Sequence, residues 1–416
     1  MNVLSENMSE QQIQKDYRAN SREKKILRRL AAAAIVLAGL LVISVIGQPA
    51  SKDYISYWSA GKLLIQHANP YSRPDVLALE RTHGYSETRP LMMRNPPWAL
   101  FLTVPLGFGN PAAGLVLWTL AAAGCIVAFI RLLKVPPEDR AFVFLFAPSI
   151  AVFRIGQTSP FLLLGFSLFL YLHRRRPFLA GASLLLMAIK PHLFLVFWAV
   201  LLADSIYRRR LLVFAGLAAA LAAGTTFAMC FNAHIWQHYF AMLRGSDLDS
   251  EFFPTTSMMF RLLIDPYAIW LLFLPSAVAI VWGLWFYTRN RLVWHWETHG
   301  MLLMLVTILV SPYSWFPDEI VLLPALAFAI TFPQRRPRSL EILVVINLVA
   351  ILVLMAGNRS IVSTVYLWTP SAWLAWFLYA TDGFRIQRGN LTIQPRETGV
   401  PLGGSSALVH EANISS

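Results

Sequence analysis

The stretch at residues 111–134 reads PAAGLVLWTLAAAGCIVAFIRLLK and decides the fold class of this chain. Its first 20 residues carry no charge, and its charged residues, Arg131 and Lys134, lie at its end. A helix needs about 20 apolar residues to cross the hydrocarbon core of a bilayer. The stretch is therefore predicted to be a membrane-spanning helix.

Apolar runs recur along the whole chain, and the composition is that of a membrane protein. Of the 416 residues, 56% are hydrophobic and 14% are charged, and the mean hydropathy is +0.54. A soluble protein carries roughly 25% charged residues. The expected architecture is an all-α polytopic membrane protein with about 12 spans. The runs lie at about 28–48, 111–134, 141–153, 160–173, 177–189, 192–206, 211–231, 268–288, 299–312, 319–332, 339–356 and 361–380.

The first apolar run follows two basic residues, Arg28 and Arg29, as in a signal peptide. The run is long and many others follow, so an uncleaved first helix is preferred.

Polar segments lie before, between and after the apolar runs. Residues 97–109 are apolar but short; they dip into the membrane, lie flat or begin a span. Long polar loops are expected at 49–96 and 232–267. The predicted divisions are a basic cytoplasmic tail at 1–27, a membrane domain at 28–383 and a disordered cytoplasmic tail at 384–416.

The basic residues orient the spans. With the N-terminus in the cytoplasm and each run crossing once, 24 of the 35 Lys and Arg residues fall inside and 11 outside. The acidic residues split almost evenly, 12 to 10, so the bias is specific to positive charge. Because cytoplasmic loops are enriched in Lys and Arg, this orientation is preferred over its reverse. The arginine clusters at 174–176, 208–210, 289–291 and 335–338 all fall inside.

The charge, the cysteines and the motifs argue against nucleic-acid binding, metal binding and a nucleotide site of the soluble type. A net charge of +13 suggests nucleic-acid binding in a soluble protein, but here the basic clusters lie between apolar runs, where topology explains them. Cys125 and Cys230 lie inside apolar runs and form no disulfide or metal pattern. The sequence has no Gly-rich phosphate loop, zinc-ligand spacing or GxSxG motif. No nucleic acid, metal or soluble cofactor is expected.

Two carboxylates fall on the outward face in this topology. Asp53 follows the first run, either as an ordinary loop residue or as a general base that deprotonates a sugar hydroxyl. Asp318 begins a later run, either as a second carboxylate or as a helix N-cap.

Cations and polar groups gather on the same face. Lys190 and Arg154 lie in very short turns, which need no charge for solubility. They either anchor the rim of the membrane or bind a phosphate group beside the low-dielectric boundary. His192 and Gln157 lie next to them, and each is either structural or a ligand for a hydroxyl-rich substrate. Outward-facing aromatics, Tyr57 and Tyr71 among them, suit an interfacial belt or stacking on sugar rings.

Four blocks in order resemble glycosyltransferase family 87, and together they span about 53–320. The blocks are DYISYWSAG at 53–61 with Asn69-Pro70-Tyr71, Asn95-Pro96-Pro97 with Pro105-Leu106, Gly156-Gln157 with Ala180-Gly181 and Lys190-Pro191, and Ser311-Pro312-Tyr313 through Asp318. The resemblance implies a C-type membrane glycosyltransferase fold, a lipid-linked sugar donor, and Asp53 as the base in the first outside loop. The site residues then expected are Asp53 and Asp318 as catalytic residues, with Tyr57, Asn69, Tyr71, Arg154, Gln157, Lys190 and His192 as substrate-binding residues.

The function that these observations favour is hexose transfer, with mannose as the first choice. The donor is expected to be a polyprenyl-phosphate sugar, and the acceptor a glycan or glycolipid outside the plasma membrane. A transporter or flippase is the chief rival, although such proteins usually carry charges in mid-membrane and repeated halves. An inactive scaffold for envelope-glycan assembly is the third reading.

The topology predicts which positions a membrane-impermeant thiol reagent reaches in intact cells. In a variant without the two native cysteines, new cysteines at Ser72 and Asp249 should react, because both positions fall outside. A cysteine at Arg209 should react only after the membrane is permeabilised. Labelling of the Arg209 position alone in intact cells would refute the orientation.

Overall fold

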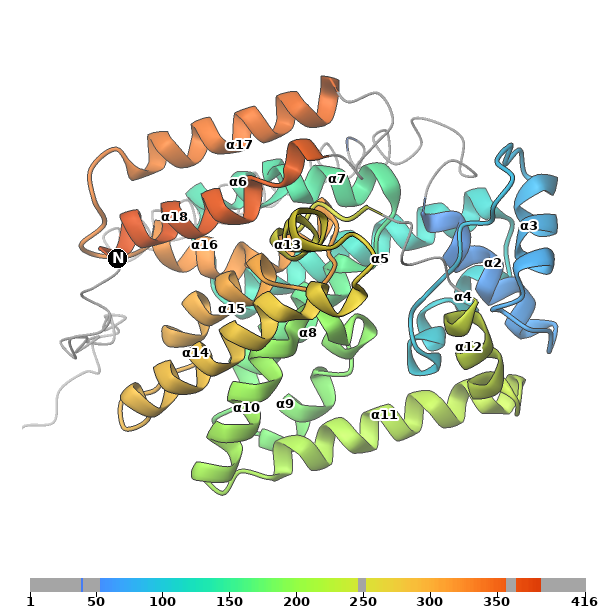
Figure 1. The fold of residues 1–416 in the computed structure, drawn as a ribbon, viewed down its shortest axis with the longest axis horizontal. Coiled ribbons are helices and arrows are strands. Elements are labelled where there is room, and N and C mark those ends of the chain that lie inside the picture. Colours follow the sequence, from blue (N-terminus) through green and yellow to red (C-terminus); the bar gives the residue numbers. More distant parts are fainter. Residues whose placement is uncertain (1–38, 40–52, 246–251, 357–363, 383–416) are drawn as a thin grey trace, which may run out of the picture.

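A computed structural model describes residue 39 and residues 53–245, 252–356 and 364–382 (Figure 1). Every regular element in these residues is a helix, which confirms the all-α class. Both predicted tails, and all of the predicted first span except Gly39, lie outside the described residues.

Four helical stretches in the described residues are long and apolar enough to cross a membrane. They are α5 (Pro111–Leu132), α11 (Leu212–Phe231), α17 (Ser339–Ala356) and Ile269–Asn290, in which the 3-10 turn η6 (Ile269–Phe273) continues into α14 (Leu274–Asn290). A fifth is obtained if the bent pair Pro177–Ile189 and Pro191–Tyr207, which turns by 117°, is one broken span. The expected count of about 12 spans is therefore not confirmed.

Proline marks the start of five of the shorter helices that the other apolar runs form. Pro148, Pro160, Pro177, Pro324 and Pro370 each stand in the first turn of a helix. Proline is accepted there because it needs no donor, but it breaks a helix that would continue from before it. The shorter helices are α6 (Arg140–Leu145), α7 (Ala147–Ile155), α8 (Ser159–Leu172), α9 (Pro177–Ser183), α10 (Leu195–Tyr207), α15 (His299–Leu309), α16 (Leu323–Ile330) and α18 (Thr369–Thr381). The 3-10 turns between them are η3 (Pro137–Asp139), η4 (Met187–Ile189), η5 (Pro191–Phe194), η7 (Phe316–Leu322) and η8 (Thr364–Tyr366).

The two segments expected to be long polar loops contain two helices each, so the expected loop architecture is not confirmed. Their helices have 9 to 12 residues each, which is too short to cross a membrane. Within 232–267, for example, Thr255 caps a helix by accepting a hydrogen bond from the Met258 amide at 3.1 Å. The helices are α2 (Tyr54–Ile65), α3 (Arg73–Thr82), α12 (Ile235–Arg244) and α13 (Thr256–Ile264), and the short apolar segment after 96 forms η2 (Pro97–Leu102) and α4 (Val104–Gly107).

Glycine allows α2 to lie directly against α4. A Cβ atom at Gly61 would collide with the Thr103 carbonyl, and one at Gly107 would collide with the backbone of Gly61. Ten of the twelve residues of α2 are buried. The helix that begins at Asp53 is thus anchored inside the fold instead of lying on its surface.

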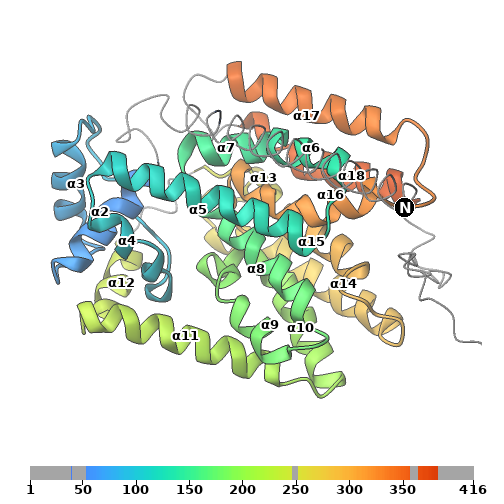
Figure 2. The same ribbon diagram turned by 180° about the vertical axis from the view of Figure 1, so that it is seen from behind.

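The two ends of the molecule differ in character. In Figure 1, α2, α3 and α12 gather at one end of the long axis, and the C-terminal end of α14 points to the other, as it does from behind in Figure 2. Three arginine clusters meet through residues 291–297: Arg174 contacts His295 and Glu297, and Arg208 donates to the carbonyls of Arg291 and Trp294. We call this the arginine-rich end.

A buried carboxyl group ties α3 to the segment that follows it. Glu80 is 0% exposed, and its Oε2 accepts a hydrogen bond from the Leu91 amide at 3.1 Å. Burial raises the pKa of Glu80 to about 7, and the bond from Leu91 offsets part of that rise.

Glu80 makes the stability of the fold depend on pH. In the unfolded chain the Glu80 carboxyl group has the usual pKa of about 4.3. In the folded chain its pKa is about 7. The folded state binds more protons between these values, so stability is lost as pH rises across this window. Glu80→Gln should lessen the fall in melting temperature between pH 5 and pH 8, measured in detergent. The exposed Glu87→Gln is the control; equal falls in both variants and the wild type would contradict this role.

Candidate functional site

Asp53 lies at the start of α2, where its side chain faces Gln157. The Gln157 amide nitrogen donates a hydrogen bond to Asp53 Oδ2. One turn along α2, the Tyr57 hydroxyl donates to Gln157 Oε1 at 3.1 Å. Both ends of the Gln157 amide are therefore held by the first turn of α2.

Gly156 places Gln157 in this position. The α7 helix ends at Ile155, and Gly156 adopts the left-handed conformation with φ of 74°, which glycine tolerates best. A Cβ atom there would lie 2.5 Å from Tyr54 Cβ, so the close approach of this turn to α2 also requires glycine. The Trp118 indole donates to the Gly156 carbonyl at 2.8 Å and stacks on Tyr57.

Lys190 lies at the break between η4 and η5, where the chain bends by 117°. The next residue is Pro191, which favours an extended backbone at Lys190 and interrupts the helix. Lys190 is only 8% exposed. Its Nζ donates to Gln157 Oε1 at 3.1 Å and to Asp318 Oδ1 at 2.7 Å.

Asp318 completes a continuous polar chain that runs from Asp53 through Gln157 and Lys190. It is 1% exposed and lies on η7, which packs against α7 and α8. Its Oδ1 also accepts from the Ser159 hydroxyl at 2.6 Å, and its Oδ2 accepts from the Trp315 amide at 3.0 Å. Asp318 thus caps its own helical turn and pairs with Lys190, and its part as a second catalytic carboxylate stays a prediction.

A cavity of about 440 Å³ opens beside this chain. Its volume is in the range of small-molecule sites, about 300–1,000 Å³. Asp53, Arg94 and Lys190 are the charged residues in its wall. The remaining lining residues are Ser56, Tyr57, Pro90, Leu91, Met92, Met93, Asn95, Pro96, Ile155, Gln157, Ile189, Pro191, His192, Tyr239, Leu243, Phe253, Tyr313 and Trp315.

Aromatic rings form one side of the cavity. The His192 ring stacks on Tyr313 with 3.6 Å between centroids, and Phe253 packs against Tyr313 and Trp315. His192 Nε2 is buried and has no hydrogen-bond partner among the described residues. A wall of aromatic faces with one polar ring atom suits a ligand with both apolar faces and hydroxyl groups.

The surroundings of Asp53 raise the pKa of its carboxyl group. Burial raises the pKa of Asp53 most strongly; the bond from Gln157 and the charge of Lys190 lower it, and the charge of Asp318 raises it. The net direction is upward. A carboxylate with a raised pKa is a stronger base than a solvated one, which suits proton abstraction from a hydroxyl group.

Three of the predicted binding residues lie outside the cavity wall. The Tyr71 hydroxyl donates to the Asn95 carbonyl at 2.9 Å, and the Asn69 side chain accepts from the Tyr71 amide at 2.9 Å. Both therefore support the wall from behind, through Asn95. Arg154 points elsewhere: its guanidinium donates to the Leu354 carbonyl of α17 at 2.5 Å.

Arg94 and Ser159 join the site although the sequence did not single them out. Arg94 precedes the Asn95-Pro96-Pro97 block, and this proximity is the signal that was available. The Asn95 side chain donates to the Ile189 carbonyl at 2.9 Å and so ties this block to Lys190. The described residues contain no group of three or more His, Cys, Asp or Glu side chains that suits a metal ion.

The comparison with known proteins yields one match. The family model for glycosyltransferase family 87 matches residues 94–312. No curated protein and no solved structure matches the chain. The matched region holds Arg94, Gln157 and Lys190, whereas Asp53 and Asp318 lie beyond its ends. Because the match covers more than half of the chain, this protein belongs to glycosyltransferase family 87 and is a glycosyltransferase.

Proposed function

We propose that this enzyme transfers a hexose, with mannose as the first choice, from a polyprenyl-phosphate donor. The acceptor is a hydroxyl group of a glycan or glycolipid on the outer side of the plasma membrane. The observation that carries the proposal is the polar chain of Asp53, Gln157 and Lys190 in the wall of one cavity, with Asp318 bonded to Lys190 outside that wall. It supplies a carboxylate base and a cation in a single small-molecule site.

Asp53 is the base in this proposal. The acceptor oxygen attacks the anomeric carbon, and the bond from that carbon to the phosphate oxygen breaks as the new glycosidic bond forms. The acceptor proton goes to the Asp53 carboxylate, and the leaving polyprenyl phosphate keeps the electron pair. Gln157 holds one Asp53 oxygen, so the carboxylate cannot rotate away from the acceptor.

Lys190 stabilises the leaving phosphate. A lysine ammonium has three donors, and two of those of Lys190 are used by Gln157 and Asp318. The third remains for the donor phosphate, where charge develops as the sugar leaves. Arg94 lies in the same wall and takes the second cationic role that the sequence suggested for Arg154.

Asp53→Asn should abolish most transfer, because it keeps the size of the side chain and removes its basicity. General-base catalysis contributes about 100- to 10,000-fold, so single-turnover transfer of radiolabelled sugar should fall within that range. Donor binding should persist, since phosphate recognition is assigned to cations. Asp75→Asn, an exposed carboxylate on α3, is the matched control. Transfer by Asp53→Asn within about threefold of the wild type, far less than the loss of a base, would remove Asp53 from this role and make Asp318 the leading candidate for the base.

Lys190→Ala should raise the donor KM by about 10- to 100-fold, the value of one charge-assisted hydrogen bond. This variant also leaves Asp318 buried without its cation, which destabilises a fold strongly. Lys190→Ala with Asp318→Asn removes both charges and separates the two effects. If the double variant melts like the wild type and uses the donor equally well, Lys190 has only a structural role.

A further inference from the structure

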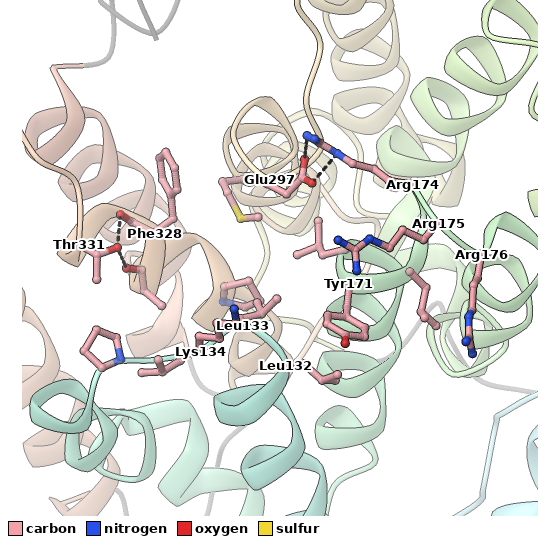
Figure 3. Close-up of a pocket in the computed structure, with 17 residues that line it drawn as sticks. Leu132, Leu133, Lys134, Tyr171, Arg174, Arg175, Arg176, Glu297, Phe328 and Thr331 are labelled. Atoms are coloured by element: carbon pink, nitrogen blue, oxygen red, sulfur yellow. Dashed lines mark hydrogen bonds and ion pairs between the residues drawn. The ribbon is translucent and has the colours of Figure 1, made fainter. Parts of the chain in front are cut away.

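A second and larger cavity, of about 920 Å³, opens at the arginine-rich end (Figure 3). It lies where α5 and α8 end, beside α16 and the start of α15. The candidate active site lies at the other end of α8: Ser159 at its beginning bonds Asp318, and the cavity is lined from Leu170 onward. At 1.5 Å per residue, the 11 residue steps from Ser159 to Leu170 separate the two by about 17 Å.

The wall of this cavity is positively charged. Lys134, Arg174, Arg175 and Arg176 line it, with Glu297 as its one acidic residue. Glu297 is engaged by Arg174, which contacts both of its carboxylate oxygens at 2.9 Å. The side chains of Lys134, Arg175 and Arg176 make no hydrogen bond or ion pair with any described residue. Three positive charges thus share the cavity without a counterion from the described chain.

The rest of the wall is apolar apart from Thr331 and the Tyr171 hydroxyl. Figure 3 shows Arg175 extending from the end of α8 toward the middle of the cavity, near Tyr171, with Arg176 at its edge. Tyr171 is 56% exposed. The apolar lining comprises Leu132, Leu133, Val135, Pro136, Leu170, Leu172, Met301, Pro324, Ala327 and Phe328. A cationic rim beside an aliphatic and aromatic wall fits a molecule with a phosphate at one end and hydrocarbon at the other.

The position agrees with such a ligand. The α5 helix has 22 residues, or about 33 Å at 1.5 Å per residue, which is close to the hydrocarbon thickness of about 30 Å. It ends at Leu132, in the wall of the cavity. The cavity therefore lies at the depth where lipid headgroups meet the hydrocarbon core.

We propose that this cavity binds an anionic phospholipid of the leaflet at the arginine-rich end. Lys134, Arg175 and Arg176 hold its headgroup phosphate, and its acyl chains lie along Leu133 and Phe328. The site is separate from the transfer reaction and does not rest on the proposed donor or acceptor.

The test measures binding of fluorescent phosphatidylglycerol to the full-length enzyme in phosphatidylcholine nanodiscs. The triple variant Lys134→Gln, Arg175→Gln, Arg176→Gln should weaken binding by roughly 100-fold, because each of the three basic residues at an anionic lipid contributes about fivefold. The control triple variant is Arg209→Gln, Arg210→Gln, Arg338→Gln. It removes the same charge from exposed positions outside the cavity wall, and it should bind within about threefold of the wild type, less than one basic residue contributes.

Equal losses in the two triple variants would overturn the proposal, since they would show general attraction to a basic surface. Competition by millimolar glycerol phosphate at the same site would also overturn it, by showing that a free phosphate suffices without acyl chains. If the triple variant does not fold, Arg175→Gln alone should still weaken binding by about fivefold. Transfer activity in phosphatidylcholine nanodiscs should stay unchanged in the cavity variant, whereas a drop there would assign these residues to the reaction.

Discussion

The ion pair between Lys190 and Asp318 is the contact on which the candidate site depends. Both side chains are buried, and each needs the other because an unpaired charge in a low-dielectric interior costs several kcal/mol. The pair joins the bend between η4 and η5 to the turn η7. Ser159 at the start of α8 and Gln157 just before it bond the same two side chains. The pair therefore sets the position of Gln157, and through it that of Asp53.

This arrangement accounts for the number of broken helices around the site. An unbroken helix satisfies its own backbone and turns its side chains outward, so it brings few polar groups together at one depth. Here the chain breaks at Gly156, at Lys190 and before Phe316, and each break delivers one polar group to the cavity wall or the chain behind it. Such irregular backbone is tolerated at membrane depth where it is buried in protein or lines a cavity. The short helices expected to be full spans follow from the same breaks.

The charges of the molecule fall into two groups with different surroundings. At the candidate site, the carboxylates Asp53 and Asp318 and the cation Lys190 are linked through Gln157. At the arginine-rich end, Lys134, Arg175 and Arg176 have no described counterion. A helix of 14 residues separates the groups. The candidate site holds its charges in a hydrogen-bonded network, while the arginine-rich end presents positive charges without a described counterion.

The sequence by itself determined the all-α class and the family, because a lack of charge over long runs and the order of short motif blocks are local properties of the chain. The family was confirmed by the match over residues 94–312. The number of long helices and the helix at 54–65 required the tertiary structure, because burial against neighbours, not hydropathy, stabilises that helix. For the site residues, too, the sequence identified the candidates and the fold decided which of them come together. Asp53, Gln157, Lys190 and Asp318 were identifiable as polar residues at the ends of apolar runs, but Arg154 had the same pattern and bonds Leu354 instead. Only the fold distinguishes these cases, since the direction of a side chain depends on the turn that holds it and on the partners that residues far away in the chain bring to it.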